Sequence, residues 1–147
     1  MRKQYTGLPL SKPDPGLKGA INWTPLLKVR ISANHQSTPI LPAVVDSGSP
    51  YCLFRADVAD FLHIDLRKAP QGSLGGIIGG PHDPVFFHNV NVVVENNWTI
   101  NVYAGFMKKL CTAAILGRGG FFDRFQVLFD HSKNPPEFEV TKIEWTN

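Results

Sequence analysis

The sequence is poor in cysteine and lacks long hydrophobic runs. Its 147 residues include two cysteines, Cys52 and Cys111, too few for a disulfide framework, so we expect reduced, buried thiols. No stretch approaches the roughly 20 apolar residues that cross a bilayer. No apolar run follows Met1 to Gly7, where a secretory signal would carry one. We therefore expect a cytoplasmic protein with no membrane partner.

Clustered charge and metal-ligand spacing are also missing. The net charge is +3, and the only adjacent basic pairs are Arg67-Lys68 and Lys108-Lys109. Nucleic-acid binding usually needs a basic stripe or cluster, so we expect no nucleic-acid partner. His82, Asp83 and His88 fit no strong zinc pattern, and no histidine lies next to either cysteine in sequence. We expect no metal and no cofactor.

The chain is instead rich in turn residues and short apolar segments. It has 12 prolines, 13 glycines and 43% hydrophobic residues, which favours strands and turns around one core. Residues 1–20 are expected to form an extended N-terminal arm, and residues 21–147 one mostly β domain. Val58, Phe61 and Leu62 lie at helical spacing and predict one short helix. The expected strands are residues 28–32, 40–45, 85–94, 99–106, 113–117, 126–129 and 137–143.

The segment Ala43-Val44-Val45-Asp46-Ser47-Gly48-Ser49 is the most informative. An apolar run delivers a carboxylate into a turn of small residues, although burying a charge is costly. Taken alone, the Asp-Ser-Gly triplet is also explained by an Asx turn that closes a hairpin.

Three further features accompany this triplet. The apolar run Tyr51 to Phe54 follows it directly, so both arms of the loop enter the core. Ala114-Ile115-Leu116-Gly117-Arg118 is a second apolar run that ends in glycine. Between them, the glycines around Ile77-Ile78 predict a flap that closes over a substrate, with a plain flexible loop or a phosphate-binding loop as alternatives. Pro81 and the missing Lys-(Ser/Thr) argue against phosphate.

Together and in this order, these motifs resemble the retropepsin-like aspartic proteases over roughly residues 25–130. The resemblance implies a closed acid-protease barrel with one short helix that is active as a two-fold dimer. It implies that Asp46 is the catalytic acid, that Ser47 hydrogen-bonds across the dimer, and that the Gly48 carbonyl meets the substrate backbone. Ser49 completes the active-site loop. Arg118 matches an arginine whose acidic partner in viral members would stand at Pro50 here. The implied flap residues are Gly75, Gly76, Ile77, Ile78, Gly79 and Gly80, and the segment behind the loop is Leu116, Gly117 and Arg118.

One motif supplies only half of the aspartate pair that such enzymes use. The implied function is therefore an aspartic endopeptidase that hydrolyses peptides as a homodimer through two Asp46 carboxylates. A non-catalytic dimerisation or binding module with the retropepsin fold is the alternative. A third possibility is an unrelated β-barrel binding protein in which Asp46 is only a turn residue.

Overall fold

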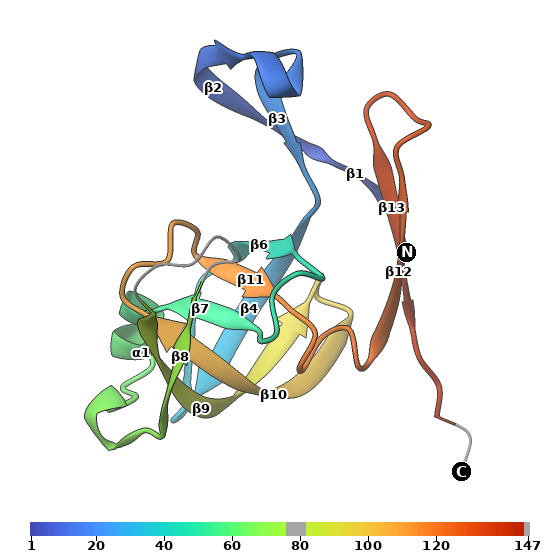
Figure 1. Ribbon diagram of the computed structural model, residues 1–147. Helices are drawn as coiled ribbons and strands as arrows, with labels where there is room; N and C mark the ends of the chain where they lie inside the picture. The colour runs from blue at the N-terminus through green and yellow to red at the C-terminus, as the bar shows by residue number, and fades with distance from the viewer. Residues whose placement is uncertain (76–81, 146–147) are drawn as a thin grey trace. The chain divides into compact units, whose positions relative to one another are not determined.

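The computed structural model describes residues 1–75 and 82–145 (Figure 1). The chain is mostly β, with 57% of its residues in strands, one short α-helix among the described residues and a closed six-stranded barrel. These coarse features confirm the fold class that the sequence predicts. The backbone divides into two units, Leu27–Asp123 on the one hand and Met1–Leu26 with Arg124–Asn147 on the other.

The first of these units holds the barrel. Its strands follow one another in the order β4, β6, β11, β7, β10 and β9, and β9 pairs back onto β4 to close the circle. The short strands β5 (Gln36–Ser37) and β8 (Gln71–Leu74) extend the sheet from β4 and β9. The barrel strands are β4 (Leu26–Ala33), β6 (Leu41–Val45), β7 (Leu53–Arg55), β9 (Asp83–Val94), β10 (Trp98–Met107) and β11 (Ala114–Leu116).

Alternating apolar residues fill the barrel interior. Over residues 90–94 of β9 and 100–104 of β10 the buried positions recur at every second residue, the period of a strand with one face in a core. Phe54 of β7 and Phe106 of β10 pack together with ring centroids 5.8 Å apart. The alternating buried residues are Val90, Val92, Val94, Ile100, Val102, Ala104 and Phe106.

The β9–β10 hairpin forms where the sequence predicts it. Its turn contains Glu95 and Asn96 at positive φ (52° and 54°), and the Asn97 N–H donates to the Val94 carbonyl at 3.0 Å. Asparagine tolerates this left-handed backbone better than most residues. Glu95 holds the turn to β4, since its Oε1 accepts the Lys28 N–H at 2.6 Å.

The α-helix α1 spans Ala56–Phe61, close to its expected position, but its apolar face differs from the expected one. Val58 and Leu62 are buried, whereas Phe61 is 50% exposed and Ala59 is buried. The six-residue helix is too short to carry a long amphipathic stripe, so the neighbouring chain decides which side is covered. A 3₁₀ turn, η2 (Leu66–Lys68), follows it.

The second unit contains two separate sheets. In one, β1 (Arg2–Gln4) pairs with β13 (Glu137–Lys142), which pairs with β12 (Phe125–Asp130). In the other, β2 (Thr6–Asp14) pairs with β3 (Gly19–Thr24), and the 3₁₀ turn η1 (Pro15–Leu17) joins them. The predicted terminal hairpin is thus present as β12 and β13.

The N-terminal residues, expected as an extended arm, are extended but also paired. Between β1 and β2, the Tyr5 N–H donates to the Pro136 carbonyl at 2.8 Å. The Tyr5 hydroxyl and His131 Nε2 are hydrogen-bonded at 2.9 Å. Burial raises the pKa of Tyr5. These contacts fix the start of the chain to the β12–β13 connection.

Candidate functional site

Asp46 lies at the end of β6 and is held by β11. β6 and β11 run parallel, with Val44 opposite Ile115 and Val45 opposite Leu116. The Asp46 N–H donates to the Leu116 carbonyl at 3.0 Å. β11 also pairs with β7 in the antiparallel sense, with Ile115 opposite Leu53. The strand that ends in Ile115-Leu116 therefore lies between the strand that enters the Asp46 loop and the strand that leaves it (Figure 1).

The loop itself is closed by short local bonds. Asp46 Oδ1 accepts the Gly48 N–H at 2.9 Å, and the Asp46 carbonyl accepts the Ser49 N–H at 3.2 Å. This is the Asx turn that a structural role would require. It uses one acceptor position of a carboxylate that has two oxygens and about four lone-pair sites. The turn therefore agrees with both a structural and a chemical role for Asp46.

Burial differs between the loop residues. Asp46 is half-buried and Ser47 and Gly48 are exposed, while Ser49 is 7% exposed. The Ser49 hydroxyl donates to the Tyr51 carbonyl at 2.7 Å, which fixes the chain between the loop and β7. The three exposed or half-exposed residues, Asp46, Ser47 and Gly48, are thus available to a partner molecule.

The segment after β11 packs against the same loop through its backbone. The Arg118 N–H donates to the Ser49 carbonyl at 2.9 Å, and the Gly119 N–H to the Pro50 carbonyl at 3.0 Å. A Cβ on Gly117 would lie 2.0 Å from the Tyr51 carbonyl oxygen, so glycine alone fits there. The structure thus brings Leu116, Gly117 and Arg118 to the Asp46 loop, and Arg118 meets it through main-chain atoms.

A partly exposed apolar cluster adjoins the loop. Three buried residues, Leu53, Val85 and Met107, form its base. Tyr51 meets the ring of Phe87 edge-on, with centroids 5.0 Å apart, and Phe87 stacks on Tyr103 at 5.4 Å. The partly buried members packed on the base are Tyr51, Leu74, Phe87, Leu110 and Ile115. The cluster thus packs partly buried side chains from the end of the loop, β11 and the end of β8 on one buried base.

The expected flap lies between two paired strands. β8 pairs with β9 in the antiparallel sense, with Leu74 opposite Asp83. Gly75 lies so close to His82 that a Cβ there would be 2.6 Å from the imidazole ring. The other proposed flap residues, Gly76, Ile77, Ile78, Gly79 and Gly80, lie outside the described residues.

The described parts of the chain were also searched for a metal site, for disulfides and for a membrane-spanning helix. Within residues 1–75 and 82–145, no three His, Cys, Asp or Glu side chains gather so as to hold a metal ion. Cys52 is buried and Cys111 is exposed, and neither forms a disulfide. Over the same residues, no helix has the length and apolar character needed to cross a bilayer.

Two contributors to the site carry no clear signal in the sequence. The apolar run Tyr51 to Phe54 predicts a core segment, but not that the Tyr51 ring meets Phe87 of β9. The pairing between β11 and β6 is likewise non-local, and no local pattern specifies it. Comparison with known proteins gives no match to a family model and none to a curated protein.

Proposed function

We propose that this protein is an aspartic endopeptidase of the retropepsin type, in which two copies each contribute Asp46. The observation that carries the proposal is the position of β11 between β6 and β7, where its Leu116 carbonyl binds the Asp46 backbone. A loop supported on both arms can hold a carboxylate rigidly, as catalysis requires. One such loop per chain makes the homodimer part of the proposal.

The chemistry follows from bringing two carboxylates together. Two such groups within hydrogen-bonding distance cannot both ionise easily, so they share a proton and titrate as a pair. The ionised member takes a proton from a water molecule, which attacks the peptide carbonyl carbon. The protonated member stabilises the developing oxyanion and later protonates the leaving nitrogen. Neither a metal nor a covalent intermediate takes part in this scheme.

The surroundings of the loop support a peptide or protein substrate. The partly exposed cluster around Tyr51, Phe87 and Ile115 offers apolar walls beside the Asp46 loop, and such walls take up substrate side chains. The β8–β9 hairpin leads from this cluster into the glycine-rich segment. The flap role that the resemblance implies for this segment stays a prediction. The cytoplasmic location expected from the sequence stays a prediction.

The test is the substitution Asp46→Asn, which keeps the shape of the side chain and its bond to the Gly48 N–H. We expect it to abolish hydrolysis of a peptide library at mildly acidic pH, because the amide cannot act as a base. Asp60→Asn, at an exposed position of α1, is the matched control and should retain full activity.

The outcomes separate the candidate functions. Residual hydrolysis near the wild-type rate in purified Asp46→Asn would contradict the catalytic assignment. A wild-type dimer without hydrolysis would instead identify a non-catalytic dimerisation module. A wild-type monomer without hydrolysis would leave Asp46 as a turn residue of a binding protein.

A further inference from the structure

The β2–β3 hairpin exposes apolar side chains that a stable hairpin would cover. It is a two-stranded sheet in which Leu8 is 38%, Ile21 44% and Trp23 41% exposed. The Trp23 ring lies over Gly7, where a Cβ would be 3.1 Å from it. Two strands alone are marginally stable in water, and a third strand or a packing surface is needed. A surface that covers these side chains would therefore stabilise the hairpin.

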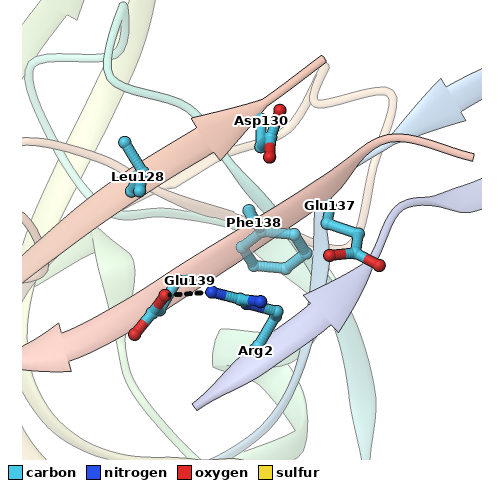
Figure 2. A pocket seen from close by; sticks show the side chains of 6 residues that line it. All are labelled: Arg2, Leu128, Asp130, Glu137, Phe138 and Glu139. Atoms are coloured by element: carbon cyan, nitrogen blue, oxygen red, sulfur yellow. Dashed lines mark hydrogen bonds and ion pairs between the residues drawn. The ribbon is translucent and has the colours of Figure 1, made fainter. Parts of the chain in front are cut away.

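The three-stranded sheet of the same unit carries a group of side chains that line a pocket (Figure 2). Leu128 of β12 is 63% exposed and stands opposite Glu139 of β13, which stands opposite Arg2 of β1. Asp130 stands opposite Glu137. Residues opposite each other share a face, so one face carries three carboxylates and a single guanidinium, with exposed Leu128 on the edge strand beside them. We call it the acidic face, defined by Arg2, Leu128, Asp130, Glu137 and Glu139.

The carboxylates of this face act together on Arg2. Arg2 Nη2 donates to Glu139 Oε2 at 3.0 Å. This bond, with the negative charges of Glu139, Glu137 and Asp130, raises the pKa of Arg2. Since carboxylates outnumber the guanidinium, the face keeps net negative charge and suits a cationic partner.

The hairpin has the opposite balance. Lys12 and Lys18 are exposed at its tip end. The same end carries one acid, Asp14, whose Oδ1 accepts the Gly16 N–H at 2.7 Å and the Leu17 N–H at 3.2 Å, so two lysines and one carboxylate leave this end with net positive charge. The hairpin thus exposes apolar and cationic side chains, while the acidic face is anionic and exposes one apolar side chain, Leu128.

We propose that the β2–β3 hairpin of one chain docks on the acidic face of a second copy, and that the second copy returns the same contact. Both complementary surfaces occur on one chain, and a two-fold contact uses each of them twice. A second copy is favoured over another protein because the Asp46 site of the proposed function is incomplete without one. In this respect the inference rests on that function, but the association itself can be measured without any activity.

Charge reversal tests the contact. The double variant Lys12→Glu/Lys18→Glu reverses the charge of the hairpin, and Asp130→Asn/Glu137→Lys reverses the charge of the acidic face. The asparagine keeps an acceptor for the Ser132 hydroxyl, which donates to Asp130 Oδ1 at 2.6 Å. Sedimentation equilibrium should show a wild-type dimer and, for each variant alone, a dimer dissociation constant raised about tenfold or more, the effect of opposing like charges. An equimolar mixture of the two variants pairs opposite charges at both contacts and should restore dimers.

Two further variants sharpen the test. Trp23→Ser should weaken the dimer about thirtyfold, as loss of an aromatic anchor does. Lys68→Glu, at an exposed position of the other unit, is the matched control and should leave the dimer unchanged.

The failures of the two proposals are distinguishable. A wild-type monomer at all concentrations, an unresponsive dimer, or a mixture that does not reassociate would overturn the docking proposal. If the reversals separate the chains as expected but no peptide is cleaved, only the proposed function fails. If hydrolysis survives every reversal in an unchanged dimer, only the docking proposal fails.

Discussion

At the scale of single residues, Gly117 tests the support of the Asp46 loop. Its backbone lies against Tyr51, and a Cβ would meet the Tyr51 carbonyl oxygen at 2.0 Å. Because main-chain atoms cannot rotate away, we expect Gly117→Ala to lower the free energy of unfolding by about 3 kcal/mol. Urea denaturation measures this change.

Gly19 provides the control for that substitution. It lies at the start of β3, and a Cβ there would meet nothing within 4 Å. We expect Gly19→Ala to change the stability by less than about 0.5 kcal/mol. Equal effects of the two substitutions would contradict the close approach of β11 to the loop.

Asp65 carries a pH prediction. Its bonds to Arg67, with the guanidinium Nε at 2.9 Å, lower its pKa from 3.8 to about 2. A carboxyl whose pKa is lower in the folded state stabilises the fold above its unfolded pKa and loses that effect as the pH falls. The contribution should therefore be complete above pH 3.8 and disappear as the pH falls to about 2.

A carboxyl-detected NMR titration measures this pKa directly. Arg67→Gln should return it toward 3.8, because the charged donor is gone. An Asp65 pKa near 3.8 in the wild-type protein would show that the ion pair does not persist in solution.

At the scale of elements, the end of α1 offers a comparison between a packed apolar residue and an exposed one. Leu62 is fully buried at the end of the helix, whereas Phe61 is 50% exposed. We expect Leu62→Ala to cost about 3 kcal/mol, since it leaves a cavity, and Phe61→Ala to cost about 1 kcal/mol or less. Thermal unfolding of both variants checks the order, and a larger loss for Phe61→Ala would show that the helix packs on its other side.

Local patterns predicted most elements but few of their partners. Alternation of apolar residues and an Asn-Asn turn specify β9 and β10, because hairpin neighbours are also neighbours in sequence. The same patterns do not indicate that β9 pairs with β4, or that the N-terminal strand β1 pairs with β13. Those registers depend on which surfaces meet after collapse, so residues 1–20 could be predicted as extended but not as paired.

The candidate site was predictable in the same partial way. The residue types of Asp46 to Ser49 and of Leu116 to Arg118 indicate two loop segments, and the structure brings the two together. Tyr51 and Phe87 gave no such signal, because an aromatic residue in an apolar run reads as core whether or not it lines a surface. The side of the sheet to which a side chain points is fixed only in the folded sheet, and the sequence indicates it only through the alternation of apolar and polar residues.

At the scale of the whole molecule, the proposed activity should depend on concentration. One chain supplies one Asp46, so the pair of carboxylates exists only in a dimer. The specific activity should fall when the protein is diluted below its dimer dissociation constant, and light scattering on the same samples should show the mass falling in parallel. Full specific activity from a monomer would contradict the two-copy site.

The position of β11 also orders events during synthesis. Asp46 bonds through its backbone to Leu116, a residue that leaves the ribosome much later. At roughly 5–20 residues per second, the nascent chain waits several seconds between the two. Through that interval the Ala43-Val44-Val45 edge has no strand to receive it, and an open apolar edge is where chains aggregate. A ribosome that stalls before Ala114 would therefore leave a chain that lacks the proposed activity and is prone to aggregation, until three more residues give β6 its second neighbour.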